Sequence, residues 1–119
     1  MELIDIIKAL SHKNRLRIIN LLNQDKLCVC ELENIMDTTQ SNVSRHLSKL
    51  KQVDLIVDDR NAQWVYYELN EKFLTKHPFV KTIIEDELEE EYFQKDMERL
   101  DYYQESGWTC EDLQEKDLF

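Results

Sequence analysis

Glycine and proline are almost absent from this sequence, which contains one of each among its 119 residues. The chain therefore has no glycine-rich turn of the kind that cradles phosphates, and no Gly/Ser linker or low-complexity tract marks a domain boundary. It also lacks any apolar run near the roughly 18 residues that a membrane-spanning helix needs. Its first residues, MELID, carry acid where a signal peptide would carry base. We expect a folded domain in the cytoplasm, with no membrane partner.

Cysteine is scarce as well, with three residues, an odd number that argues against a disulfide framework. In a reducing cytoplasm such thiols serve as ligands, as redox groups or in packing. Cys28 and Cys30 are one residue apart at the start of an apolar-periodic segment, and Cys110 stands alone. The three histidines are not spaced like zinc ligands. We interpret the thiol pair as a sensor for a soft ligand.

Basic residues are outnumbered, and the net charge of −10 is unusual for a nucleic-acid-binding protein. The excess acid lies in one part of the chain. Residues 1–80 hold 11 basic and 11 acidic residues, whereas residues 81–119 hold 4 basic and 14 acidic ones. The neutral part contains two basic clusters, Lys13, Arg15 and Arg17 and then Arg45, Lys49 and Lys51. This part is compatible with a nucleic-acid interface, and we interpret the acidic end as a solvated face.

Apolar residues at helical spacing predict a helix-rich first half. A first short helix has one face formed by Leu3, Ile7 and Leu10. Ser11 is the expected N-cap of a second helix. The buried stripe of that second helix consists of Leu16, Ile19, Leu21 and Leu22.

A third helix is predicted over residues 28–36, followed by a turn over residues 37–40 and a fourth helix to about residue 52. On the third helix, Cys30 shares the polar face with Glu33, and Cys28 lies at the margin of the apolar face, where a small core side chain is the alternative interpretation. Either Gln40 or Ser41 is expected to cap the fourth helix. Its predicted apolar stripe is Val43, Leu47 and Leu50.

The outer face of the fourth helix is polar and cationic, with no acidic residue from Gln40 to Val53. A helix-turn-helix needs such a face because its second helix enters the major groove. His46, on the flank of the stripe, resembles a structural histidine but remains in the candidate set. The residues predicted to contact double-stranded DNA are Gln40, Ser41, Asn42, Ser44, Arg45, His46, Lys49 and Arg60.

A β-hairpin is predicted after this unit, with strands at residues 55–57 and 63–69 and a turn at 58–62 that places Arg60 at the tip. From there Arg60 can reach a phosphate or the minor groove. A helical stripe from Phe79 to Leu100, with the first helix, is a candidate dimer face. The pattern fades after Tyr103, so residues 105–119 are expected to form an acidic tail behind a domain of residues 1–104. Residues 106–110 are expected to be mobile and to become ordered only by packing of Trp108 or by binding through Cys110.

These features predict a mainly α protein with a small β-hairpin, that is, a winged helix-turn-helix. Three motifs, LCVCEL at 27–32, SNVSRHL at 41–47 and WVYY at 64–67, resemble in this order the ArsR/SmtB family of metal-responsive repressors. The resemblance covers roughly residues 2–100. It implies a homodimer that binds operator DNA and dissociates from it when a thiophilic ion binds to the protein. The Cys-Val-Cys element resembles that of sensors of trivalent arsenic or antimony. The resemblance therefore implies one of these metalloids as inducer and no catalytic cofactor.

The sequence departs from that family pattern in two ways. Many arsenic sensors have a third cysteine where this chain has Glu33, a poor ligand for a soft centre. The cadmium and lead sensors add N-terminal cysteines, and residues 1–27 contain none. Cys110 either completes a three-thiolate site or is an incidental thiol of the tail. In the second case the better inducer is an arsenic that already carries an organic group and needs two sulfurs. We favour the second case on sequence alone.

Three alternatives to an arsenic-responsive repressor follow from the same residues. A cadmium-, lead- or zinc-responsive repressor of the same family would use the same thiols. An enzyme could use Cys28 in thiol exchange, but no acid/base pair accompanies it. A winged helix that acts only as a protein-interaction module would leave Arg45, Lys49 and Arg60 without a role.

Overall fold

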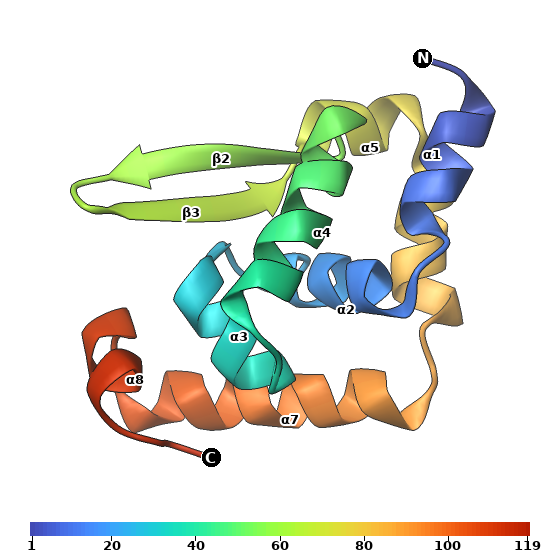
Figure 1. The fold of residues 1–119 in the computed structure, drawn as a ribbon. Coiled ribbons are helices and arrows are strands. Elements are labelled where there is room, and N and C mark those ends of the chain that lie inside the picture. The colour runs from blue at the N-terminus through green and yellow to red at the C-terminus, as the bar shows by residue number, and fades with distance from the viewer.

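A helix-turn-helix unit formed by α3 (Val29–Met36) and α4 (Gln40–Gln52) lies at the centre of the molecule, as Figure 1 shows. The computed structural model describes residues 1–119. The remaining elements are α1 (Leu3–Leu10), α2 (Lys13–Leu22), β1 (Leu27–Cys28), β2 (Ile56–Asn61), β3 (Trp64–Leu69), α5 (Glu71–Lys76), α6 (Pro78–Thr82), the π-helix η1 (Ile83–Glu87), α7 (Glu91–Ser106) and α8 (Cys110–Glu115). The predicted winged helix-turn-helix is confirmed.

The predicted limits of α3 and α4 are confirmed to within a residue, but two predicted helix caps are wrong. The Thr39 hydroxyl, rather than that of Ser41, caps α4 by accepting a hydrogen bond from the Asn42 amide at 3.2 Å. His12 replaces Ser11 as the cap of α2, since its Nδ1 accepts from the Asn14 amide at 3.1 Å. Val43, Leu47 and Leu50 are buried as expected.

The wing is a three-stranded antiparallel sheet in the order β1-β3-β2, and not an isolated hairpin. The β2 and β3 strands pair from Ile56 opposite Leu69 to Asn61 opposite Trp64. The reversal is therefore at residues 62 and 63, later than predicted, and Arg60 lies within β2 rather than at the tip. Sequence analysis also missed β1, which places Cys28 opposite Tyr66 of the wing.

The long helix predicted from Phe79 onward is interrupted. α6 ends at Thr82, the adjoining η1 ends at Glu87, and α7 starts at Glu91 with a changed direction (Figure 1). Residues 85–91 contain six acidic side chains, whose repulsion at helical spacing disfavours a continuous helix. α7 then packs under α2 and α3. Its Phe93 and Leu100 are core residues, so this part of the expected dimer face is unavailable to a second copy.

The C-terminal residues are ordered by packing, since Trp108 packs against the core and Cys110 is buried in it. α7 continues to Ser106, so the expected boundary at residue 104 falls inside a helix, and Gly107 turns the chain with a φ of 74°. α8 then packs against α3 and buries Cys110 and Leu113. Thr109 and Asp112 form a reciprocal capping box that starts this short helix. None of the helices is both long enough and apolar enough to cross a membrane.

Candidate thiol site and DNA interface

The three cysteines meet at the start of α3. Cys28 ends β1 and precedes α3, Cys30 lies in the first turn of α3, and Cys110 is the first residue of α8. Their exposed fractions are 2%, 7% and 5%. The expectation that Cys30 faces solvent is wrong because α8 covers that side of α3. The Cys30 sulfur lies 3.6 Å from the carbonyl oxygen of Cys110.

The sulfurs of Cys28 and Cys110 lie close together, and a carboxylate oxygen of Glu31 is beside them. These three atoms are all within 4.8 Å of one another, and the Cys30 sulfur is outside the group. The thiol that joins Cys28 in this group thus comes from α8. Cys28 has an extended backbone, with φ −91° and ψ 170°. The two sulfurs of the Cys-Val-Cys element are therefore not fixed on opposite sides of one helix, as a regular helix would require.

Glu31 and Tyr103 hold this arrangement in place. One carboxylate oxygen of Glu31 accepts from the Cys28 amide at 2.9 Å, and the other accepts from the Tyr103 hydroxyl at 2.5 Å. Burial and the hydrogen bond to Glu31 raise the pKa of Tyr103 far above its usual value. Sequence analysis missed both residues. Glu31 could have been found as the third residue of a capping box that begins at Cys28.

The surroundings keep the thiols of Cys30 and Cys110 protonated. Burial, followed by the neighbouring Cys28 and Glu33, raises the pKa of Cys30 to about 11. The pKa of Cys110 lies well above its usual value because its thiol hydrogen-bonds to Cys28 and is buried near Glu31. Reactive cysteines have a lowered pKa and access to solvent. Neither condition holds for Cys30 or Cys110, so neither of these two thiols suits thiol exchange.

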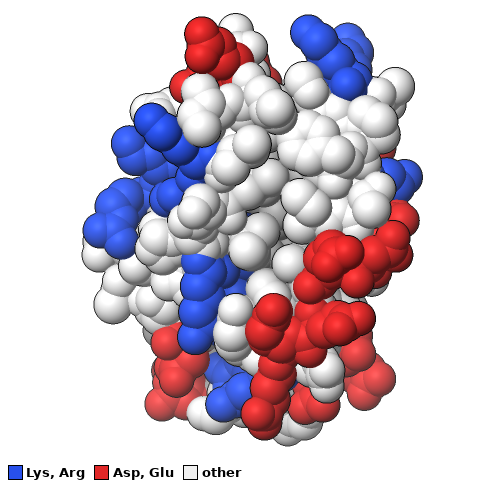
Figure 2. Space-filling view, turned by 90° about the vertical axis from the view of Figure 1, so that its right-hand side faces the viewer, with Lys and Arg blue, Asp and Glu red and all other residues white.

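The second helix of the helix-turn-helix exposes most of the predicted DNA-contacting residues. Asn42 is half-buried and accepts a hydrogen bond from the Asn14 side chain at 3.1 Å. Arg60 is exposed on β2. Basic side chains gather along the left edge of the face in Figure 2. The exposed candidates on α4 are Gln40, Ser41, Ser44, Arg45 and Lys49.

His46 does not belong to this exposed set, and its place among the DNA-contacting residues is a correction. Only 2% of His46 is exposed, because its ring lies on the buried side of α4. Its ring lies 3.2 Å from an Arg15 nitrogen, 3.5 Å from an Arg45 nitrogen and 4.2 Å, between centroids, from the His12 ring. Burial, with His12 and the two arginines, lowers the pKa of His46 to about 4. It is a neutral structural histidine.

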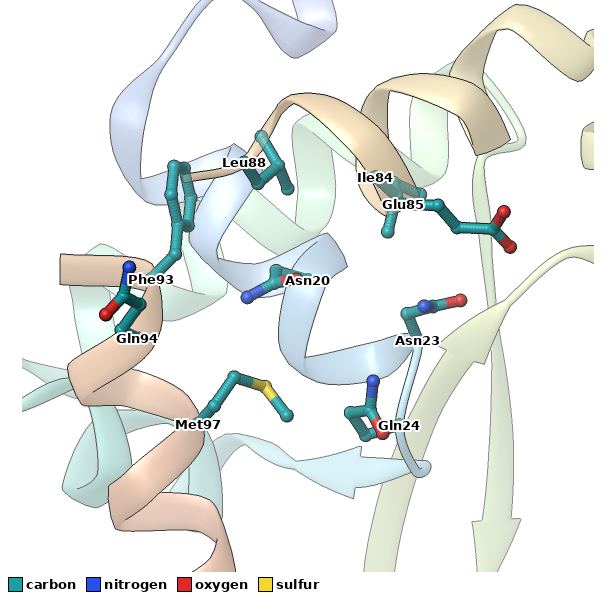
Figure 3. A pocket seen from close by; sticks show the side chains of 9 residues that line it. All are labelled: Asn20, Asn23, Gln24, Ile84, Glu85, Leu88, Phe93, Gln94 and Met97. Carbon is teal, nitrogen blue, oxygen red and sulfur yellow. The ribbon is translucent and has the colours of Figure 1, made fainter. Parts of the chain in front are cut away.

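The largest hollow of the molecule lies away from the thiols. It has a volume of about 510 Å³ between α2, η1 and α7. Figure 3 shows that amide side chains, including Asn20 and Gln94, and apolar ones, including Phe93 and Met97, line it. It contains no thiol, and Glu85 is its only acidic residue. The cysteine thiols, which are the candidate ligands for a soft ion, therefore lie outside this hollow, at the start of α3.

The fold and the two sites define the class of winged helix-turn-helix regulators. The sequence pattern of the family described as "Bacterial regulatory protein, arsR family" matches residues 12–57. The chain is 36% identical over 73 residues to the arsenical resistance operon repressor of Staphylococcus xylosus, a match that covers 61% of this chain and 70% of that protein. The chain belongs to the ArsR family.

Other relatives point the same way. The arsenic resistance transcriptional regulator ArsR2 of Pseudomonas putida is 42% identical over 67 residues, 56% of this chain and 58% of that protein. The cadmium resistance regulatory protein CadC of Listeria innocua is 39% identical over 61 residues, 50% and 51% of the two chains. The chain thus spans little more than half of these two proteins. All three relatives are named as regulators or repressors and not as enzymes, in agreement with the sequence analysis.

Solved structures share the fold. The homodimeric winged helix-turn-helix domain of Mb0332 from Mycobacterium bovis has a TM-score of 0.60 at 26% identity, covering 71% of this chain and 80% of that one. The transcriptional regulator HlyU from Vibrio vulnificus has a TM-score of 0.56 at 30% identity, covering 67% and 84%.

Proposed function

We propose that this protein is an operator-binding repressor that trivalent arsenic or antimony releases from DNA by binding to Cys28, Cys30 and Cys110. One observation carries the proposal: the sulfurs of Cys28 and Cys110 lie within 4.8 Å of each other at the start of the helix that precedes α4. Soft thiolates suit a soft metalloid. The relatives from Staphylococcus xylosus and Pseudomonas putida are named for arsenic resistance.

On the DNA side, α4 would enter the major groove and Arg60 would approach a phosphate. The residues proposed to contact DNA are Gln40, Ser41, Asn42, Ser44, Arg45, Lys49 and Arg60. An imperfect palindrome read by a homodimer fits the related homodimeric fold. α1 offers a surface for the second copy, since its Leu3, Ile4 and Ile7 are exposed. Uncharged side chains cover most of the upper half of the face to which α1 belongs (Figure 2).

The protonated state of Cys30 and Cys110 suits a metalloid. Trivalent arsenic in water is a neutral trihydroxide, and each thiol that replaces a hydroxide sends its proton away in a water molecule. No net proton is released. A divalent cation must instead expel the thiol protons, which is harder where the pKa of Cys30 is raised to about 11.

Ligand capture would reach the DNA interface through α3. Cys30 must swing toward Cys28 and Cys110 to share one centre, and this motion pulls on the first turn of α3 and on α8. α3 packs directly against α4. A shift of α4 relative to its copy in a dimer then weakens operator binding, with a coupling free energy of roughly 1–3 kcal/mol.

A second candidate inducer is a divalent cation such as cadmium. The observation that favours it is the Glu31 oxygen beside the sulfurs of Cys28 and Cys110. Two sulfurs and one oxygen suit a borderline cation better than arsenic. The relative from Listeria innocua is named for cadmium resistance.

One titration tests both candidates. Reduced protein on a labelled operator fragment is titrated with arsenite, antimonite, cadmium and zinc, and release is followed by fluorescence anisotropy. We expect arsenite and antimonite to release the DNA at the lowest concentrations. Cys28→Ser and Cys30→Ser should bind the operator as the wild type does but should not dissociate from it when arsenite is added. Release of either variant at the wild-type arsenite concentration contradicts the proposal.

Cys110→Ser tests the third ligand. X-ray absorption of the arsenite complex should show three sulfur neighbours in the wild type and two in this variant. Burial of Cys110 beside Cys28 now favours the three-sulfur scheme for inorganic arsenite. An unchanged count of two would remove Cys110 from the site.

A further inference from the structure

A series of hydrogen bonds runs from α7 across α2 to the start of α4. Arg17 of α2 donates through Nε and Nη2 to the two carboxylate oxygens of Asp96 on α7. Its remaining nitrogen, Nη1, donates to the side-chain Oδ1 of Asn14 at 3.2 Å. Asn14 in turn donates through Nδ2 to the Oδ1 of Asn42 at 3.1 Å. The side chain of Asn42 on α4 is therefore connected to α7 through two residues of α2.

These contacts fix the orientation of both asparagine side chains. A guanidinium group donates hydrogen bonds and cannot accept them, so Asn14 must turn its oxygen toward Arg17. The Nδ2 group of Asn14 then faces Asn42, and a donor at that point requires the oxygen of Asn42. Arg17 is itself held by Asp96, which is 1% exposed. The Oδ1 of Asn42 is thus turned toward α2.

Asn42 lies in the part of α4 that would meet the bases. It is the third residue of the helix, and its backbone amide donates to the capping hydroxyl of Thr39. N-terminal residues of a recognition helix contact base edges in the major groove. The side chain of Asn42 is half-buried, and its one hydrogen bond within the protein is the bond that it accepts from Asn14. Its Nδ2 group is therefore free to donate to DNA.

We propose that Asn14 determines the base preference of the operator by holding Asn42 as a hydrogen-bond donor to one base of each half-site. This inference rests on the proposed function and deepens it. In the major groove guanine presents two acceptors, N7 and O6, whereas cytosine presents an amino donor. A donor at this position therefore selects guanine and rejects cytosine on the contacted strand. An unconstrained asparagine commonly binds adenine through both of its polar atoms, but here Oδ1 is held by α2.

The variant Asn14→Asp should turn the Asn42 side chain over. A carboxylate only accepts hydrogen bonds, so Asp at this position would accept from Arg17 and from the Nδ2 of Asn42. Asn42 would then present Oδ1 to the groove, and the preference should move from guanine toward bases with an amino donor, such as cytosine. Asn14→Ala removes the contact and leaves the side chain of Asn42 free to turn, so the preference should relax without reversing.

The test measures operator affinity of the reduced protein, without inducer, by fluorescence anisotropy. The operator fragments carry each of the four base pairs in turn at every position of one half-site. Asn42→Ala identifies the position that Asn42 contacts, because discrimination is lost there. At that position the wild type should bind guanine roughly tenfold more tightly than cytosine, and Asn14→Asp should lower this ratio to about one or below. Gln52→Glu, the same amide-to-acid change at the exposed end of α4, is the matched control and should keep the wild-type ratio.

The ratio of two affinities in one variant separates base preference from a general loss of binding or folding. A wild-type ratio in both Asn14→Asp and Asn14→Ala overturns the role of Asn14, as does an equal fall of the ratio in Gln52→Glu. If Asn42→Ala relaxes no position, Asn42 contacts no base and the inference is wrong. If the wild type binds the operator no more tightly than unrelated DNA, the proposed function itself is overturned, and this inference with it.

Discussion

The carboxylate of Asp96 on α7 accepts two hydrogen bonds from the guanidinium of Arg17 on α2, each at 2.7 Å. Arg17 also donates to the carbonyl oxygen of Met36 at 3.0 Å. Asp96 is 1% exposed. The pair therefore joins α7 to the last turn of α3, immediately before the turn into α4.

The isosteric change Asp96→Asn should be strongly destabilising. It leaves the Arg17 charge without its partner in a largely buried position, and breaking such a pair costs about 3–5 kcal/mol. Urea denaturation followed by circular dichroism measures the change. Asp58→Asn is the matched control, because it breaks the exposed Lys51–Asp58 pair and should therefore lose much less stability than Asp96→Asn. Equal losses in the two variants would show that α7 is not anchored in this way.

A second arginine, which lies on α7, reaches the same end of α3. Arg99 donates to the carbonyl oxygens of Ile35 at 2.5 Å and Asn34 at 2.6 Å. The last carbonyls of a helix lack i+4 amide partners within it, and the Asn34 carbonyl accepts only from the capping Asp37 amide, at 3.3 Å, in addition to Arg99. At the other end of α3, Tyr103 of α7 bonds Glu31 beside the thiols. α7 thus contacts both ends of α3, the ligand end and the end that leads into α4.

Arg99→Met should uncouple sensing from DNA release. The thiols and the DNA-contacting residues stay in place, so arsenite binding and operator affinity should change by less than about threefold. The arsenite-induced loss of operator affinity should shrink markedly, since the link at the far end of α3 is missing. Calorimetry for arsenite and anisotropy for the operator give the two quantities separately. A full wild-type release would exclude α7 from the coupling.

Local patterns in the sequence were enough to place the helix-turn-helix. The limits of α3 and α4 and the stripe of Val43, Leu47 and Leu50 follow from an apolar period that can be found within a single segment. The resemblance of three motifs then identified the family correctly.

The thiol site could be predicted only in part, because its geometry depends on segments far apart in the chain. The burial of Cys30 depends on α8, a helix of six residues that is too short to show an apolar period. The extended conformation of Cys28 comes from its pairing opposite Tyr66. The Cys28–Cys110 pairing likewise needs the path of α7, which no local pattern specifies.

The exposed cations of α4 should dominate operator affinity. The double variant Arg45→Ala, Lys49→Ala should weaken operator binding at least about tenfold and lower the slope of log affinity against log salt by roughly 2. Lys72→Ala with Lys76→Ala is the control, since it removes the same charge from the exposed face of α5. The control should leave the affinity nearly unchanged. A similar loss of operator affinity in both double variants would show that the affinity depends on the net charge of the protein and not on contact of α4 with the groove.

His46 should make the protein sensitive to mild acid. Its pKa is lowered to about 4 in the folded chain by burial and by the nearby His12, Arg15 and Arg45, against 6.5 for an unperturbed histidine. The unfolded chain therefore binds the proton first as the pH falls. Stability is retained above about pH 6.5 and is lost progressively down to about pH 4, by at most ~3 kcal/mol.

The variant His46→Gln isolates this effect, because glutamine can bond the two arginines without titrating. The free energy of unfolding, measured in urea between pH 7 and pH 5, should decrease with acid by clearly more in the wild type than in this variant. His77→Gln, which changes a half-buried ring elsewhere, should keep the wild-type slope because His46 is intact. If His46→Gln keeps the full wild-type dependence of the free energy of unfolding on pH, another group causes the acid sensitivity. In that case the neutral state of His46 does not stabilise the fold beside Arg15 and Arg45.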